Sequence, residues 1–353
     1  MNEFVIGYYA FLIGASCLAA YYKQRTVFLL LFSLTLASFV VGIVGGEPAL
    51  WTITVAAAAL ALAGGTAYAF REFLVIIAPM ETAKALRTAP LTASFGMFVI
   101  FTYAIMGIFA PVIAPFGEAE IITEAFAPAD DTLLLGADQL GRDMFSRIVY
   151  GARNTVGLAL VATTLAFTMG ALAGLFAATK GGWFDQILGR FADVIMSIPS
   201  LIFALLLLSI FGTNLFVLVI IIAVIYAPRV YRLARAVAGN VVVMDYVEAA
   251  RLRGEGTWYL IRREILPNSS APLIAEFGLE FCFVFLLVAG LSFLGLGIQP
   301  PTADWGSMVR ENATLISFGE LTPLIPAGAI ALLTVAVNFV VDWMLYRSSG
   351  LRE

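Results

Sequence analysis

Long apolar stretches make up most of the chain, and short polar segments separate them. A helix needs about 20 apolar residues to cross the roughly 30 Å hydrocarbon core of a bilayer. The stretches are too long and too continuous for the alternating strands, about ten residues each, of a membrane β-barrel. The pattern therefore predicts an all-α integral membrane protein, a polytopic helical bundle. Nine spans are expected, at residues 4–22, 27–44, 50–70, 94–114, 154–178, 195–212, 214–230, 271–293 and 324–346.

The composition supports a membrane protein and removes several kinds of chemistry. Of the 353 residues, 61% are hydrophobic and only 12% are charged, whereas soluble domains carry about 25% charged residues. A water-soluble shell cannot be built from so few charges. The chain has no histidine, which excludes a Ser-His-Asp triad and a His-ligated metal site. The net charge of −4 gives no indication of a nucleic-acid partner.

The distribution of basic residues predicts the orientation. If the segment around Arg71 is cytoplasmic, alternation of the spans places most of the 20 lysines and arginines on that side. Lysine and arginine are enriched in cytoplasmic loops of membrane proteins. We therefore expect a multi-pass protein of the cell (inner or cytoplasmic) membrane with its N-terminus outside and its C-terminus inside. The basic residues left outside are Arg142, Arg147, Arg153 and Arg310.

The polar segments divide the chain into three parts. Residues 1–70 form a three-span N-terminal extension, and residues 71–93 mix apolar and charged positions as a helix on the inner membrane surface does. Residues 94–353 form a six-span core. A cytoplasmic loop at 229–268, rich in arginine, interrupts this core.

The chain lacks the residues of an ATPase. A Walker A loop needs a lysine preceded by glycine to hold phosphates. Lys23, Lys84 and Lys180 follow a tyrosine, an alanine and a threonine. No carboxylate pair lies in a setting suited to hydrolysis. We therefore expect neither a catalytic residue nor a cofactor bound by this chain.

The 229–268 loop contains a short predicted helix. Asp245 and Glu248 have the spacing of a capping box, which predicts a helix from Tyr246. Gly254 is placed to end the helix in a left-handed conformation. Small side chains leave room for another backbone to approach, at Ala249 and Ala250.

A second helix is predicted after this glycine. Thr257 can cap it, and Pro267 is expected to end it. Two other interpretations of the loop are a solvated basic connection and a DNA-reading helix-turn-helix. The second helix runs directly into the span at 271–293, which leaves it little freedom to enter a DNA groove.

The order of motifs resembles one known family. EAARLRG at 248–254, followed by ILPN at 265–268, resembles the EAA loop of ABC-importer permeases. The segments at 134–153 and 292–308, LLGADQLGRDMFSRIVYGAR and SFLGLGIQPPTADWGSM, resemble the dipeptide/oligopeptide/nickel class of these permeases. The LGxDxxGRDxxSR pattern is typical of the C-type permease subunit. The resemblance covers roughly residues 90–353, so it assigns no role to the three-span extension.

The resemblance implies a function and a set of partners. The fold would be a type I ABC-importer permease core that carries peptides or similar small solutes by alternating access. The expected partners are a second, B-type permease, two cytoplasmic ABC ATPases that bind ATP and Mg, an external substrate-binding protein and membrane lipid. In this family the EAA loop docks on the ATPase. The residues implied in that coupling are Tyr246, Glu248, Ala249, Ala250, Gly254, Glu255 and Gly256.

Two acids lie inside a predicted span. Glu276 and Glu280 are one helical turn apart on one face, and an ionised acid near the bilayer centre costs about 2.5–3.5 kcal/mol. Either they line the translocation path, or they are protonated or hydrogen-bonded to neighbouring helices. They would also serve as the proton or cation site of a self-sufficient secondary transporter or channel. A third interpretation is a membrane-anchored scaffold with a basic docking loop.

Small residues predict one close helix contact. Gly170 and Gly174 are four residues apart in the span at 154–178. Such pairs let two helix backbones approach closely within a membrane.

Overall fold

The computed structural model describes residues 48–77, 79–318 and 322–348, together with isolated residues 11, 12, 15, 27, 30, 31 and 34. The chain divides into two compact units, Met1–Ile77 and Ala78–Glu353. The predicted spans at 4–22 and 27–44 lie almost entirely outside the described residues. The three-part division expected from the sequence remains a prediction.

The first unit contributes one long described helix. α3 runs from Pro48 to Ile77 over 30 residues, so it covers the predicted span at 50–70 and continues past it. Near its end, Arg71 and Glu72 form an ion pair at 3.1 Å between Nη2 and Oε1.

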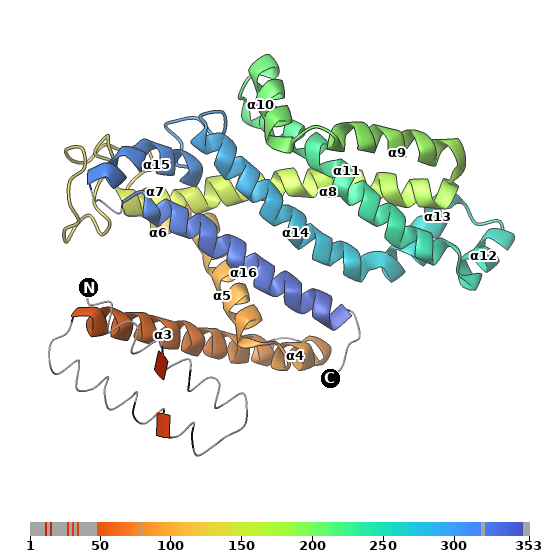
Figure 1. The fold of residues 1–353 in the computed structure, drawn as a ribbon. Helices are drawn as coiled ribbons and strands as arrows, with labels where there is room; N and C mark the ends of the chain where they lie inside the picture. Colours follow the sequence, from red (N-terminus) through yellow and green to blue (C-terminus); the bar gives the residue numbers. More distant parts are fainter. Residues whose placement is uncertain are drawn as a thin grey trace. The chain divides into compact units, whose positions relative to one another are not determined.

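The second unit is built from helices, and its described residues contain isolated β-bridges but no strand. α12 and α13 lie at one end of the long helices, which we call the α12 end; α15 and the loop at residues 114–143 lie at the opposite end, the α15 end (Figure 1). The helices are α4 (Met80–Arg87), α5 (Leu91–Ile108), α6 (Ala110–Ile113), α7 (Met144–Gly151), η1 (Ala152–Val156), α8 (Gly157–Lys180), α9 (Gly182–Met196), α10 (Ser200–Phe211), α11 (Leu215–Val242), α12 (Asp245–Leu252), α13 (Thr257–Tyr259), η2 (Leu260–Ile265), α14 (Leu266–Phe293), α15 (Trp305–Asn312), η3 (Ala313–Phe318) and α16 (Leu324–Ser348).

The described helices confirm a polytopic all-α membrane protein. Five helical stretches are long and apolar enough to cross a bilayer, and a sixth crossing results if α9 and α10 count as one broken span. The total of nine spans remains a prediction. The five stretches are Leu91–Ile108, Met144–Lys180, Leu215–Val242, Thr257–Phe293 and Leu324–Arg347.

The span predicted at 195–212 is not one continuous helix. α9 and α10 meet there at an angle of 89°, and α10 has only 12 residues, or about 18 Å of helix. Pro199 is the N-cap residue of α10. Because proline disfavours a helical conformation in the residue before it, the chain leaves the helix after Met196 and starts a new one.

Two helices are longer than their hydrophobic stretches predicted. α11 continues to Val242, not to residue 230, so Arg229 lies inside a helix and not in a loop. Pro267 does not end the second loop helix, since helical structure is continuous from Thr257 to Phe293. Pro267 lies in the first turn of α14, directly after the π-helical turn η2.

The close contact predicted for Gly170 and Gly174 is confirmed. A Cβ at Gly170 would lie 2.3 Å from the Ala227 carbonyl oxygen, and one at Gly174 would lie 2.6 Å from the Tyr231 carbonyl oxygen. Both partners belong to α11. α8 and α11 therefore touch backbone to backbone. The main apolar core lies around this pair, where α10 and α14 pack against it and α16 packs on α14.

Candidate functional site

One face of α12 is anchored in the second unit. Val247 and Ala250 are completely buried, and they pack in an apolar cluster that joins α12 to α8, α11 and η2. Arg251 adds a hydrogen bond from Nη2 to the Thr179 carbonyl oxygen at 3.4 Å. A force on α12 therefore reaches three long helical segments directly. The other members of the cluster are Leu175, Ala238, Val241, Leu260, Ile261 and Ile265.

The predicted position of Gly254 after α12 is confirmed. Its φ is +83°, in the left-handed region that favours glycine. The Glu255 N–H donates to the Ala250 carbonyl oxygen at 3.2 Å, and the Gly254 N–H donates to the Arg251 carbonyl oxygen at 2.9 Å. These two bonds form a Schellman motif, which ends α12 and directs the chain into the next helix.

The predicted capping of the two loop helices is wrong. α12 begins at Asp245 and not at Tyr246, and its N-cap residue is Met244, with no side-chain hydrogen bond. Met244 has an extended backbone, so Asp245 and Glu248 already lie inside the first turn, where they favour the positive end of the helix dipole without capping it. The next helix starts after Gly256, and no side chain caps it.

The coupling residues implied by the resemblance divide between surface and interior. Tyr246 (42% exposed) and Ala249 are on the surface, as are Glu248, Gly254 and Gly256, whereas Glu255 is half-buried. Ala250 is completely buried, so the low surface expected at two adjacent alanines is correct only for Ala249. Large apolar side chains are exposed beside it, at Val243, Met244, Leu252 and Trp258.

The two acids predicted inside the membrane lie on α14, beside an arginine of α11. Glu280 is 1% exposed, and its Oε1 lies 3.1 Å from Nε of Arg229. Glu276, one turn earlier on the same helix, is half-buried. The structure thus pairs Glu280 with an oppositely charged residue of another helix, and Glu276 lies one turn away from that pair.

Arg229 was missed from the sequence because it was assigned to the cytoplasmic loop at 229–268. A signal was present in the spacing of small and apolar residues beyond Arg229. Buried small or apolar residues recur there every three or four positions, at Val230, Ala234, Ala238 and Val241. Such spacing is typical of a helix face that continues.

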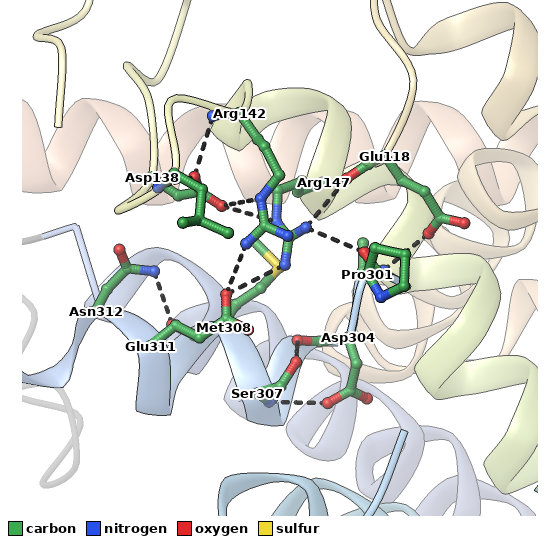
Figure 2. A network of polar contacts seen from close by, with 12 residues as sticks. Glu118, Asp138, Arg142, Arg147, Pro301, Asp304, Ser307, Met308, Glu311 and Asn312 are labelled. Atoms are coloured by element: carbon green, nitrogen blue, oxygen red, sulfur yellow. Dashed lines mark hydrogen bonds and ion pairs between the residues drawn. The ribbon is translucent and has the colours of Figure 1, made fainter. Parts of the chain in front are cut away.

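A buried ion network joins two separate segments at the α15 end (Figure 2). The Asp138 carboxylate pairs with Arg142 at 2.7 Å and with Arg147 at 3.2 Å. The Glu311 carboxylate on α15 pairs with the same two arginines, at 3.0 Å and 3.3 Å. Each acid therefore bridges both arginines, and the side chains are at most 7% exposed. Arg147 also donates to the Glu118 carbonyl oxygen at 3.0 Å.

Asp304 fixes the start of α15. Its Oδ2 accepts the Ser307 N–H at 2.8 Å, and its Oδ1 accepts the Thr155 hydroxyl at 2.8 Å. Burial raises the pKa of the Asp304 carboxyl above its ordinary value, although the hydrogen bonds that it accepts act in the opposite direction. The Trp305 indole N–H donates to the Ile148 carbonyl oxygen at 3.0 Å, so the two motif segments quoted from the sequence meet at this end, a contact that was not predicted from their spacing.

In the described part of the chain, no group of three or more Cys, Asp or Glu side chains is placed to hold a metal ion.

A family described as the binding-protein-dependent transport system inner membrane component matches residues 170–349, or 180 of the 353 residues. The di/tripeptide transport system permease protein DppC of Pseudomonas aeruginosa is 34% identical over 254 residues, which cover 70% of this chain and 84% of the relative. The probable D,D-dipeptide transport system permease protein DdpC of Escherichia coli is 34% identical over 258 residues, 73% of this chain and 86% of the relative. Among solved structures, the inward-facing MetNI methionine ABC transporter matches 59% of this chain and 98% of that chain, with a TM-score of 0.48 and 16% identity.

Proposed function

The chain belongs to the family of binding-protein-dependent transport system inner membrane components, and we propose that it is the permease subunit of an ATP-driven importer of peptides or similar small solutes. The names of its curated relatives, which are permeases for dipeptides and tripeptides, support this substrate class. In the proposed assembly the chain forms half of the translocation path. A second, B-type permease forms the other half, and two ATPase subunits bind ATP and Mg.

The observation that carries this proposal is the two-sided character of α12. One face is locked into the cluster of α8, α11 and η2, while the other exposes Tyr246 and Leu252, and Trp258 is exposed on α13. Exposed apolar patches on a folded surface mark protein interaction sites. We assign this surface, together with Glu248, Ala249, Gly254, Glu255 and Gly256, to docking of an ATPase subunit.

The rigid attachment of α12 gives the mechanism. When the two ATPases close on ATP, they would push on α12, and the buried Val247 and Ala250 would pass the movement to the long helices. The path would then change from outward to inward opening. This chain supplies the docking surface and the path, and the ATPases supply the chemistry.

The same scheme orients the protein. The α12 end would lie in the cytoplasm and the α15 end outside, with the N-terminus outside and the C-terminus inside. The network of Asp138, Arg142, Arg147 and Glu311 would hold the external loop against α15, so that a substrate-binding protein meets an ordered surface. We further assign residues 1–70 to an N-terminal extension outside the transport core at 94–353.

Glu276 and Glu280 lie one turn apart on α14, and Glu280 pairs with Arg229. We place Glu276 on the translocation path and the buried Glu280 directly behind it. The secondary-transporter alternative uses the same residues as a proton or cation site, so the energy source distinguishes the two functions.

Reconstitution into proteoliposomes tests the proposal. The chain, its second permease and the ATPases are assembled, and uptake of a mixture of dipeptides and tripeptides is measured by mass spectrometry with the binding protein and ATP added. The matched control carries ATPases whose Walker lysine is replaced. Uptake should require ATP, the binding protein and the intact lysine. Uptake by this chain alone, driven by an ion gradient, would instead establish the secondary transporter.

A further inference from the structure

Arg229 and Glu280 pair deep within their helices. Arg229 is the fifteenth of the 28 residues of α11, and Glu280 is the fifteenth of the 28 residues of α14. About 20 Å of helix therefore extends on either side of each residue. A hydrocarbon core of about 30 Å includes these positions wherever it falls along either helix. The ion pair is thus an intramembrane one.

The two partners are unequally exposed. Glu280 is 1% exposed, whereas the Arg229 side chain is 39% exposed. The guanidinium carbon lies 4.2 Å from the centre of the Phe283 ring, a cation–π contact. Glu280 and Phe283 therefore contact one side of the guanidinium, and another part of it is exposed on the surface of the second unit.

This opening belongs to a continuous face of α14. Residues spaced by three or four positions lie on one side of a helix. On α14 these residues are Glu276, Leu279, Phe283 and Leu286. Glu276 and Leu279 are half-buried, and Phe283 and Leu286 are exposed. This face of α14 thus carries Glu276 among apolar side chains, and the Arg229 guanidinium of α11 lies over Phe283.

Such a face is poorly suited to lipid. A charged side chain within the hydrocarbon core is costly unless it faces protein or water, and this face carries two partly exposed ionisable groups. Water or polar groups lower that cost. A water-filled path along this face satisfies both groups, and it also explains why an arginine held by a buried acid is not buried completely itself.

We propose that Arg229 and Glu276 form a contact point for zwitterionic solutes on the translocation path, with Glu280 as the positioning residue of Arg229. This inference rests on the proposed transport function and names a substrate chemistry for it. A guanidinium recognises a carboxylate with two parallel hydrogen bonds, and a carboxylate accepts hydrogen bonds from an ammonium group. A peptide with both termini free carries both groups.

Thiol chemistry in the full assembly tests this without knowledge of the substrate. Cys17 and Cys282 are replaced by serine and alanine, and Leu279→Cys places one thiol between Glu276 and Phe283. Reaction rates are measured with an anionic and a cationic methanethiosulfonate reagent added to the aqueous phase. The ratio of the anionic rate to the cationic rate reports the charges that face the thiol. Ile274→Cys, exposed on a different face of α14, is the matched reporter.

The proposal expects opposite shifts from the two charges. Arg229→Gln should lower the ratio at position 279 by about two- to five-fold, the size of a Coulomb term a few ångströms from a charge in water, and Glu276→Gln should raise it. Glu280→Gln should weaken the effect of Arg229 on the rate ratio at position 279, and Glu280→Asp should restore that effect. Arg232→Gln, which removes an arginine paired with Asp193 on α9, should leave the ratio unchanged, as should every variant at position 274.

Other results overturn the proposal. An unreactive thiol at position 279 would show that the partner permease or lipid covers this face. A reactive thiol whose ratio does not move in opposite directions for Arg229→Gln and Glu276→Gln would show that the two charges do not face the path. If the assembly without substitutions shows no ATP-dependent peptide uptake, the transport function itself is contradicted. Failure of the contact point and failure of the transport function are therefore distinguishable.

Discussion

The indole of Trp305 packs directly on Gly151. A Cβ at Gly151 would lie 2.4 Å from Cδ1 of the indole, and the indole N–H donates to the Ile148 carbonyl oxygen at 3.0 Å. Trp305 is completely buried, so the ring cannot move aside easily. This contact fixes α15 on the helix formed by α7 and η1.

Gly151→Ala should therefore destabilise the second unit. Overpacking of a close-packed site costs about 1–3 kcal/mol, and we expect a loss in that range in a denaturant titration of the purified chain. Gly157→Ala is the matched control, because Gly157 is helical and a Cβ added there would have open space within 4 Å. That variant should be neutral or slightly stabilising. Equal losses for the two variants would contradict the role given to Trp305.

Glu311→Gln should release the external loop from α15. The substitution removes the charge that pairs with both Arg142 and Arg147, and breaking a buried ion pair costs about 3–5 kcal/mol. Limited proteolysis should cut the segment at 115–143 faster in the variant. Asp131→Asn, a matched change at an exposed position of that loop, should leave the cleavage rate as it is. Unchanged cleavage in Glu311→Gln would show that the network does not order the loop.

Gly254→Val should misdirect the chain after α12. A residue with a Cβ resists the left-handed conformation by about 1–2 kcal/mol, and a β-branched one is a stronger outlier. We expect the protein to insert normally but to lose ATPase association in a pull-down assay and ATP-dependent uptake together. Gly256→Ala is the control for backbone strain, since its φ is −76°; it should keep normal stability. Wild-type association of Gly254→Val at normal expression would rule out the docking assignment.

Leu252→Glu should abolish ATPase docking without harming the fold. Leu252 is 82% exposed, so the charge meets solvent in the isolated chain and the unfolding free energy should change by less than about 0.5 kcal/mol. In a docked complex the same charge would be buried without a partner, which is costly. The control is Ile316→Glu, an equally drastic change at an exposed apolar residue of the α15 end. It should retain ATPase binding.

Glu248→Ala separates capping from docking. Because no side chain caps α12, and the Glu248 Oε2 lies 3.8 Å from Arg251 Nη1 on the surface, the loss of stability should be at most about 0.5 kcal/mol. A reduced affinity for the ATPase at unchanged stability would support a contact made by Glu248 itself. A loss of about 1 kcal/mol or more would instead restore the capping role that the sequence predicted.

The sequence by itself determined the membrane-spanning class, most of the long helices and the end of α12. These properties depend on local quantities: apolar length against bilayer thickness, and the backbone freedom of Gly254. The close packing of Gly170 and Gly174 was also predictable, because small residues in a membrane helix have few other uses. The motif order identified the family for the same reason, since it is a property of the chain and not of its contacts.

Only the tertiary structure decided which residues share a site. The pairing of Arg229 with Glu280 joins residues 51 positions apart, and the network of Arg142 and Glu311 joins residues 169 positions apart. No periodicity along one helix specifies such a partner on another. Ala250 illustrates the same limit: its small side chain suits a docking surface or a buried contact equally well, and the packing of α12 on α8, α11 and η2 decided that it is buried.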